Sequence, residues 1–385
     1  MRKITYPEDI INFKSAYLKD VFGTELSEMQ RRWNSLRNSN NILKTYFPKR
    51  ISKLLIADYP ILVQYYITYI RFFDSLEPLK EVLGDIFKYS KYQSKIAKFF
   101  MGKAGDLNIT TCYYCESAFI NVYEADNVEK ECLAKLNNYS FDKLKKRLKT
   151  SSDANTSAII TGRPYLTVKD FNDKWHSLPR TKKDINKFES IFNLNPQRNH
   201  FDIDHALDKG SCPIVALSLM NFVPCCQVCN EKLKRSLVLG DYLGNKPKKH
   251  LSPSSPSYDF ENQVRLRFEP SNPADASPIA LDPAYAMDNP DKYVLKFECI
   301  DSSYESIVEI FRLRERYEFH KREGLYWLQM KAKYNDSCIK LIADALSDPW
   351  FTVNKIHEDI FREDYDDKRH PCFGKLKRDI LKGPK

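Results

Sequence analysis

The fold of this chain is decided by the stretch Phe201–Asn230, which reads FDIDHALDKGSCPIVALSLMNFVPCCQVCN. Apolar and polar residues alternate at its start, which predicts a short half-buried β-strand that ends in an Asp-His pair, Asp204 and His205. One asparagine, Asn221, lies at the end of a second apolar run, and another, Asn230, directly follows a CxxC knuckle at the start of a predicted helix. The stretch therefore brings together a candidate base and candidate oxygen ligands for a hard metal.

Two CxxC knuckles supply the ligands of a predicted structural zinc site. The first is Cys112-Tyr-Tyr-Cys115 and the second is Cys226-Gln-Val-Cys229, so the metal would join segments that are distant in sequence. Structural zinc takes four ligands in a tetrahedron, and each CxxC turn offers two thiolates from one bend. Its binding energy would then become folding energy. Thiol redox chemistry and plain buried cysteines are the alternatives, and Cys225 leaves open which of two neighbouring cysteines is the fourth ligand.

Length and composition are those of a globular protein with two or three domains. The chain has 385 residues, of which 42% are hydrophobic and 29% are charged. No signal peptide is recognisable and no apolar run reaches about 18 residues, so we expect a cytoplasmic protein without a membrane span. In a reducing cytosol CxxC pairs more often bind metal than form disulfides. The formal charge of +10 suits a polyanionic partner, although solvated lysine faces give the same charge.

Periodicity and composition divide the chain into three regions. Residues 1–105 show apolar residues at helical spacing and form a predicted helical N-terminal region. Residues 106–245 hold both knuckles and the Asp-His pair, with an insertion of helices and loops at about 125–198. Residues 246–385 are predicted to be a wrapping loop followed by a helical C-terminal region. The sequence therefore predicts an α+β fold, in which a small core lies between mainly helical regions.

Some local elements can be placed more closely. The knuckle at residues 109–124 is predicted to join two short strands, and alternation predicts another strand at residues 293–300. Polar composition predicts a linker at residues 150–157 and an extended loop at residues 245–290. Helical spacing predicts two long helices, at residues 304–323 and 325–346, and we expect the charged tail that follows to be flexible beyond a last short helix.

A strand, a loop, a strand and a helix that carry DH, N and N after CxxC resemble the HNH, or ββα-metal, endonuclease family. The resemblance is to its zinc-stapled branch and covers residues 199–240 plus the first knuckle, about an eighth of the chain. It implies a small ββα-metal nuclease core with structural zinc, and hydrolysis of DNA that leaves 5′-phosphate and 3′-hydroxyl ends. The segment Phe311–Lys321 is similar to a helix that accompanies this core in some bacterial members.

The family's roles can be carried over one residue at a time. His205 resembles the general base that takes a proton from the attacking water. Asp204 and Asn230 resemble the two protein ligands of one Mg²⁺ or Mn²⁺ ion, which would polarise the scissile phosphate. Asn221 resembles the middle residue of the motif, whose side-chain oxygen would orient His205 and fix its tautomer. Candidate contacts to substrate phosphate are three lysines near the motif: Lys209, Lys232 and Lys234.

The sequence departs from the commonest family pattern in three places. Asn230 replaces the final histidine, which favours Mg²⁺ or Mn²⁺ over softer metals. The basic residue often found three positions later is Leu233 here, with Lys232 and Lys234 on either side. The insertion between the knuckles is also unusually long. None of these departures removes a residue that the chemistry requires.

Two other functions stay open beside a DNA endonuclease. One is a catalytically silent, zinc-stabilised nucleic-acid-binding or partner subunit, and the other is an RNA-cleaving nuclease. The chain has no GxxxxGK[ST] loop, so target choice would come from added domains or from a partner ATPase or sensor subunit. By analogy with the family, bacterial anti-phage defence or restriction fits this arrangement. Target sequence, the choice between nicking and double-strand cutting, and oligomeric state are not encoded in any recognisable motif.

Overall fold

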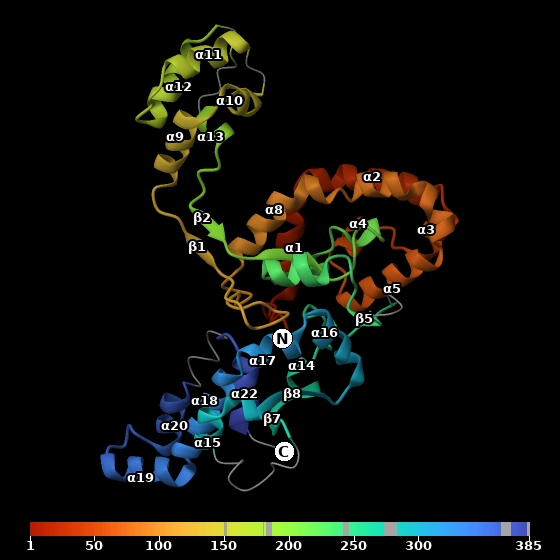
Figure 1. The fold of residues 1–385 in the computed structure, drawn as a ribbon. Coiled ribbons are helices and arrows are strands. Elements are labelled where there is room, and N and C mark those ends of the chain that lie inside the picture. The colour runs from red at the N-terminus through yellow and green to blue at the C-terminus, as the bar shows by residue number, and fades with distance from the viewer. Residues whose placement is uncertain are drawn as a thin grey trace. The chain divides into compact units, whose positions relative to one another are not determined.

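The computed structural model describes residues 1–149, 152–179, 181, 187–241, 246–272, 283–362 and 371–382. The chain forms two compact units: Met1–Asn121 together with His200–Lys385, here called the core unit, and Val122–Asn199, here called the inserted unit. Helices predominate, and the strands of the described residues form short antiparallel pairs (Figure 1). The prediction of an α+β fold is confirmed at this level.

The core unit begins with a series of helices, most of which bury an apolar face. In the helix Tyr59–Arg71 the buried residues recur at helical spacing, for example at Leu62, Val63 and Tyr66. The elements are α1 (Ile10–Tyr17), η1 (Leu18–Phe22), α2 (Glu25–Asn38), α3 (Asn41–Tyr46), α4 (Ile51–Leu55), α5 (Tyr59–Arg71), α6 (Phe73–Leu76), η2 (Glu77–Leu79), α7 (Lys80–Ile86) and α8 (Tyr89–Gly102).

A two-stranded hairpin carries the Asp-His pair. Strand β3 (Asp202–His205) pairs with β4 (Phe222–Cys225), so that His205 lies opposite Phe222. The apolar run before β4 forms two 3₁₀ turns, η3 (Pro213–Val215) and η4 (Leu219–Asn221). The helix predicted near Asn230 is η5 (Val228–Lys234), a π-helix, and the short pair β5 (Gly240–Asp241) and β6 (Lys246–Pro247) follows.

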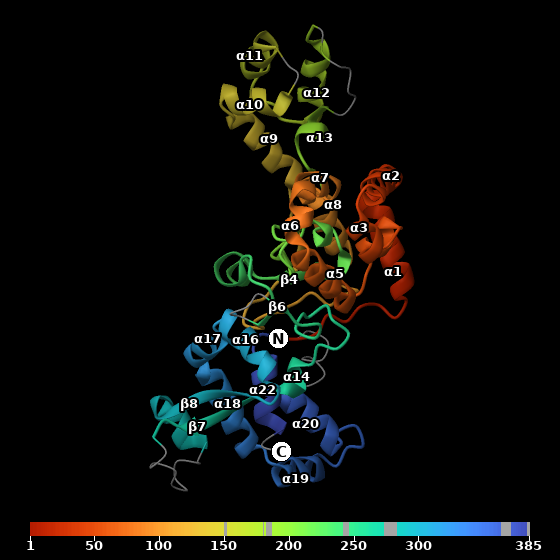
Figure 2. The same ribbon diagram turned by 90° about the vertical axis from the view of Figure 1, so that its right-hand side faces the viewer.

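The inserted unit has its own hydrophobic core. Strands β1 (Val122–Glu124) and β2 (Gln197–Asn199) pair at its two ends. Figure 2 shows its helices, which are α9 (Val128–Asn138), α10 (Phe141–Leu148), α11 (Asp153–Thr161), α12 (Val168–Ser177) and α13 (Lys187–Ile191). Leu136, Phe171, Trp175 and other buried residues form the core between them. The linker predicted at residues 150–157 is wrong in its second half: Ser152 accepts a hydrogen bond from the Asn155 amide and caps α11. Residues 150–151 lie outside the described residues.

The C-terminal part of the core unit is built on a hairpin that the sequence predicted only in part. The strand expected at residues 293–300 is observed as β8 (Tyr293–Cys299), and its partner β7 (Val264–Pro270) lies where an extended loop was expected. The alternating VRLRF of β7 was the missed signal. The loop prediction also covers residue 245 and residues 273–282, which lie outside the described residues. Two short helices flank β7: α14 (Phe260–Gln263) and α15 (Pro283–Asp288).

The two long helices predicted after β8 are in fact shorter, separate helices. Arg312 adopts a positive φ of 50°, which ends the first of them, and Asn335 caps another by accepting a hydrogen bond from the Cys338 amide. The elements are η8 (Pro290–Lys292), η9 (Ser302–Tyr304), α16 (Glu305–Ile310), α17 (Leu313–Phe319), α18 (Lys321–Lys333), α19 (Asp336–Leu346), α20 (Val353–Phe361) and α22 (Gly374–Lys382). The predicted tail includes residues 363–370 and 383–385, which the structure does not describe. Across the described parts of the chain, every helix is too short or too polar to cross a membrane.

Candidate active site and metal centre

Four buried cysteines come together in the core unit: Cys112, Cys115, Cys226 and Cys229. Their sulfur atoms all lie within 4.8 Å of one another, and the Cys115 and Cys226 sulfurs are 3.9 Å apart. A tetrahedral zinc ion with Zn–S bonds of about 2.3 Å would need sulfurs about 3.8 Å apart. The cluster could therefore hold a metal such as zinc, and Cys226 rather than Cys225 is its fourth member.

Hydrogen-bond donors surround the sulfur atoms. The Ser117 hydroxyl donates to the Cys115 sulfur at 3.2 Å, and the Cys226 amide donates to the Cys112 sulfur at 3.3 Å. Hydrogen bonds from the neighbouring thiols lower the pKa of Cys115 well below its usual value, and the nearby Arg316 adds to this. Such donors suit a four-thiolate metal site, because its ligands carry more negative charge than a divalent ion can neutralise.

Helix α17 contacts the cysteine cluster directly, which sequence reasoning did not predict. Arg316 donates from Nη1 to the Cys229 sulfur at 3.4 Å and from Nη2 to the Ser117 hydroxyl at 3.0 Å. The Tyr317 hydroxyl donates to the Cys115 carbonyl at 2.8 Å. The resemblance of Phe311–Lys321 to a helix that accompanies the family core was the available signal. It gave no role to either residue.

Asp204 is 3% exposed and both of its carboxylate oxygens have partners. The Tyr114 hydroxyl donates to Oδ2 at 2.7 Å, and the Lys234 ammonium lies 3.1 Å from the same oxygen and 3.3 Å from Oδ1. Lys234 is fully buried and also donates to the His205 carbonyl at 2.6 Å. Because Tyr114 lies between the two cysteines of the first knuckle, it joins the cysteine cluster to Asp204.

His205 points to the opposite face of β3, because successive side chains of a strand alternate. Its ring packs at 4.5 Å from the Tyr89 ring and at 5.0 Å from the Phe222 ring, and the residue is only 6% exposed. Nε2 lies 3.0 Å from the Ala216 carbonyl, which can only accept, so this nitrogen carries a proton. Burial holds the pKa of His205 well below its usual value, and the charge of Lys209 acts in the same direction.

Asn221 braces the loop between β3 and β4. Its side-chain oxygen accepts from the Leu207 amide at 2.7 Å, and its amide nitrogen donates to the carbonyls of Leu207 and Val215, both at 3.0 Å. The predicted contact with His205 is replaced by these bonds, while the Ala216 carbonyl orients the imidazole. Asn221 therefore positions His205 through the loop backbone.

The predicted hard-metal ligands have different partners. Asn230 donates from Nδ2 to Oδ2 of Asp202 at 3.2 Å, whereas Asp204 contacts Tyr114 and Lys234. Their oxygen atoms are the donors that Mg²⁺ prefers, but a carboxylate that already holds an ammonium does not form an open site. As arranged here, Asp204 and Asn230 do not fit a shared Mg²⁺ or Mn²⁺ ion.

The three lysines predicted to contact phosphate differ in exposure. Lys209 and Lys232 are exposed, and the Lys209 ammonium lies 5.0 Å from the centre of the Tyr89 ring. Lys234 is buried against Asp204 and His205, so its charge faces inward. Only the first two are placed to meet a molecule from solvent.

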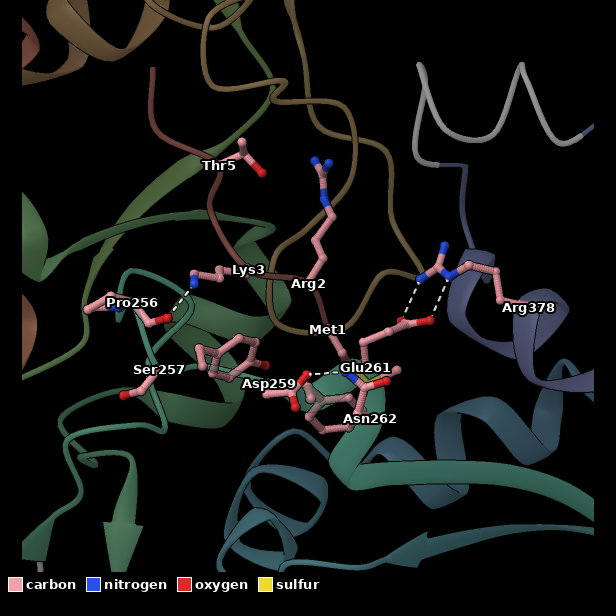
Figure 3. Close-up of a pocket in the computed structure, with 12 residues that line it drawn as sticks. Met1, Arg2, Lys3, Thr5, Pro256, Ser257, Asp259, Glu261, Asn262 and Arg378 are labelled. Atoms are coloured by element: carbon pink, nitrogen blue, oxygen red, sulfur yellow. Dashed lines mark hydrogen bonds and ion pairs between the residues drawn. The ribbon is translucent and has the colours of Figure 1, made fainter. Parts of the chain in front are cut away.

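A cavity of about 640 Å³ lies elsewhere in the core unit. Its lining includes Lys3, Glu261 and Arg378, and Arg378 forms a bidentate pair with Glu261 at 2.9 Å (Figure 3). It contains none of the residues predicted to form the site. Charged groups in this cavity thus already neutralise one another in part.

Comparison of the chain with protein-family models, with curated protein sequences and with solved structures gives no match.

Proposed function

We propose that the protein is an endonuclease that hydrolyses DNA phosphodiester bonds, with His205 as the general base. The state of the imidazole carries the proposal: Nε2–H donates to the Ala216 carbonyl, and the lowered pKa keeps the ring neutral. Nδ1 is therefore unprotonated and can accept a proton. A neutral imidazole of fixed tautomer suits the activation of an attacking water near pH 7.

The surroundings of His205 support this role by holding the ring in one orientation. Tyr89 from α8 and Phe222 from β4 pack against the ring, and Asn221 fixes the loop that supplies the Ala216 carbonyl. A catalytic group works best when the surrounding packing locks its geometry before substrate binds.

Exposed lysines near the hairpin support a phosphodiester substrate. Lys209 and Lys232 are accessible and carry charges that suit phosphate oxygens. The net charge of +10 also favours association with nucleic acid. DNA is proposed as the substrate because the resemblance of the motif to the HNH family favours it over RNA.

The family resemblance implies Mg²⁺ or Mn²⁺ as a cofactor, with Asp204 and Asn230 as its ligands. The contact between Lys234 and Asp204 conflicts with that ligand set, so the proposed chemistry is argued from His205 only. Metal dependence is tested as a separate arm of the experiment.

One observation favours a second candidate, a zinc-stabilised nucleic-acid-binding subunit that does not cut. The buried Lys234 ammonium neutralises the carboxylate that a catalytic ion would need. Such a subunit would bind DNA without breaking it. Cleavage therefore separates the two candidates.

The test is a plasmid assay with the full-length protein. Supercoiled plasmid is incubated with wild type, His205→Ala and His176→Ala, without divalent metal and with Mg²⁺ or Mn²⁺. His176 is an exposed histidine of the inserted unit and serves as the matched control. We expect nicking by wild type and by His176→Ala, and a rate about 10²–10⁴-fold lower for His205→Ala.

Equal cutting by His205→Ala would remove His205 as the base, and absence of cutting in every metal condition would favour the binding subunit. Nicks that DNA ligase can seal would agree with 5′-phosphate and 3′-hydroxyl ends. A labelled RNA of the same sequence, cut faster than the DNA, would overturn the choice of substrate. Zinc content and circular dichroism of both variants show whether each has folded.

A further inference from the structure

The inserted unit carries half of the net charge of the chain in a fifth of its length. Between Val122 and Asn199 there are 15 lysines and arginines against 10 aspartates and glutamates, a net charge of +5 out of +10. The unit has a hydrophobic core of its own and contains none of the cysteines or site residues of the core unit. Its basic surface is therefore not explained by the site described above.

Helix α10 carries a large part of this charge. Leu144 and Leu148 are buried in the core of the inserted unit, and Ser140 caps the helix. The rest of the helix surface and the C-cap expose five basic side chains: Lys143, Lys145, Lys146, Arg147 and Lys149. Asp142 is the single acidic residue of the helix.

Three of these basic side chains have neither an ion-pair nor a hydrogen-bond partner among the residues that the structure describes. Lys145 pairs with Asp153, and Arg147 donates to the Ile191 carbonyl. The other three, Lys143, Lys146 and Lys149, recur at every third position along about 9 Å of the helix axis. They form one stripe of unneutralised charge, here called the α10 lysine stripe.

Stabilisation of the helix does not account for the stripe. Cations are favourable near the C-terminus of a helix and unfavourable near its N-terminus. Lys149 follows the last turn, but Lys143 lies in the first turn of α10. Because the helix dipole disfavours a cation at the position of Lys143, we explain the stripe by a bound anion rather than by helix stability.

We propose that the α10 lysine stripe binds the phosphate backbone of duplex DNA. The choice of DNA rests on the proposed function, and the inference deepens it by giving the inserted unit a role in substrate binding. Single-strand binding surfaces add aromatic rings on which bases stack. No exposed aromatic residue lies on α10, and Phe141 is only half-buried at its start, so the stripe offers charge without a stacking surface.

The covalent connection between the units allows DNA that is bound by the inserted unit to stay close to the core unit, whatever the orientation of the two units. The insertion leaves the core unit after Asn121 and returns at His200, where the His200 amide donates to the Asn121 carbonyl at 2.9 Å. His200 precedes Asp204 by four residues in the chain. A duplex held by the inserted unit is thus tethered to the core unit, which raises its effective concentration there.

The experiment measures binding rather than cleavage. Fluorescence anisotropy of a labelled 25-base-pair duplex is recorded with full-length protein in buffer without divalent cation, from 50 to 200 mM salt. The variant Lys143→Gln/Lys146→Gln/Lys149→Gln is compared with Lys296→Gln/Lys333→Gln/Lys340→Gln, which removes three exposed lysines of the core unit. The two variants have the same net charge.

We expect the α10 variant to weaken Kd about tenfold or more at 100 mM salt and to lower the slope of log K against log salt by about 2 to 3. The control variant should stay within about twofold of wild type. Equal Kd values and slopes for wild type and the α10 variant would overturn the proposal. Equal losses in both variants would also overturn it, because they would show an effect of net charge only.

The partner and the enzyme are tested separately by this design. Loss of single-stranded RNA binding in the α10 variant, with duplex DNA binding unchanged, would overturn the choice of duplex DNA. A wild type that binds through the stripe but never cuts would contradict the proposed nuclease and leave the stripe intact. If wild type cuts DNA and the α10 variant binds DNA as tightly as wild type, the proposed nuclease is left intact and the role of the stripe is contradicted.

Discussion

The cysteine cluster and the hairpin that carries Asp204 and His205 belong to one compact unit. The candidate metal ligands come together in the cluster but not on the hairpin. Four sulfur atoms lie within 4.8 Å of one another and face a common centre. The oxygen donors do not, because Asp204 contacts Tyr114 and Lys234, and Asn230 contacts Asp202. The four thiols are therefore arranged for a shared metal ion, whereas Asp204 and Asn230 are held apart by their own partners.

Tyr114 connects the two sites. It is part of the first knuckle, donates to Asp204, and stacks on Phe311 at 4.4 Å. A metal that orders the knuckle also orders this hydroxyl. Removing partners from each site in turn should therefore affect the two sites to different degrees.

The largest effect is expected for the cysteine cluster. Cys229→Ser should abolish the binding of one zinc and lower the free energy of unfolding by at least about 5 kcal/mol, because zinc binding to such sites contributes about 10–16 kcal/mol. Metal content and urea unfolding measure this. Cys338→Ser, a half-buried cysteine outside the cluster, should change both little. Wild-type protein purified without bound metal would contradict the assignment.

A smaller loss is expected when Asp204 loses its ammonium. Lys234→Met should cost about 3–5 kcal/mol, because removing one partner of a buried pair leaves an uncompensated charge. Asp204→Asn in the same chain should restore part of the loss, and the exposed Lys232→Met should have almost no effect. Unfolding of wild type, Lys234→Met, Asp204→Asn and the double variant gives the coupling energy. Purely additive losses would mean that the pair is not coupled.

Loss of the Asn221 side chain should lower the free energy of unfolding by a somewhat smaller amount. Asn221→Ala removes three buried hydrogen bonds and leaves their backbone partners unsatisfied, so we expect a loss of about 2–4 kcal/mol. Asn262→Ala, which removes an exposed amide bonded to Asp259, is the matched control and should cost about 0.5 kcal/mol or less. A loss no greater than that of the control would show that Asn221 does not brace the loop.

The smallest effect is expected from pH. The pKa of His205 is lower in the folded state than its usual value of 6.5, so below pH 6.5 the unfolded chain binds a proton that the native chain excludes. Stability that is fully present above pH 6.5 should therefore fall by up to about 1.4 kcal/mol for each pH unit below it. His205→Gln should lack this component. Parallel pH curves for the two proteins would contradict the burial of a neutral imidazole.

The sequence predicted features that are set by short-range patterns or by chemically unusual residues. Strands β3 and β8 follow from alternation, and the cysteine cluster follows from two CxxC turns. The break at Arg312 could not be predicted, because a positive φ there comes from the tertiary fold rather than from glycine. The helical spacing on both sides of it is undisturbed.

Contacts between distant segments were the main part of the site that the sequence did not reveal. Lys234 differs from Lys232 only in the direction that the π-helix η5 gives each side chain, and this decides which lysine is buried. Arg316 reaches the Cys229 sulfur across 87 positions of the chain. Neither contact leaves a local pattern, since both depend on how remote elements pack.

The most direct test of the central claim is the rate at which supercoiled plasmid is nicked by wild type, His205→Ala and His176→Ala at equal concentration. The account predicts equal nicking by wild type and His176→Ala, and a loss of at least about 10²-fold for His205→Ala with its zinc still bound. A folded His205→Ala protein that cuts as fast as wild type would contradict it.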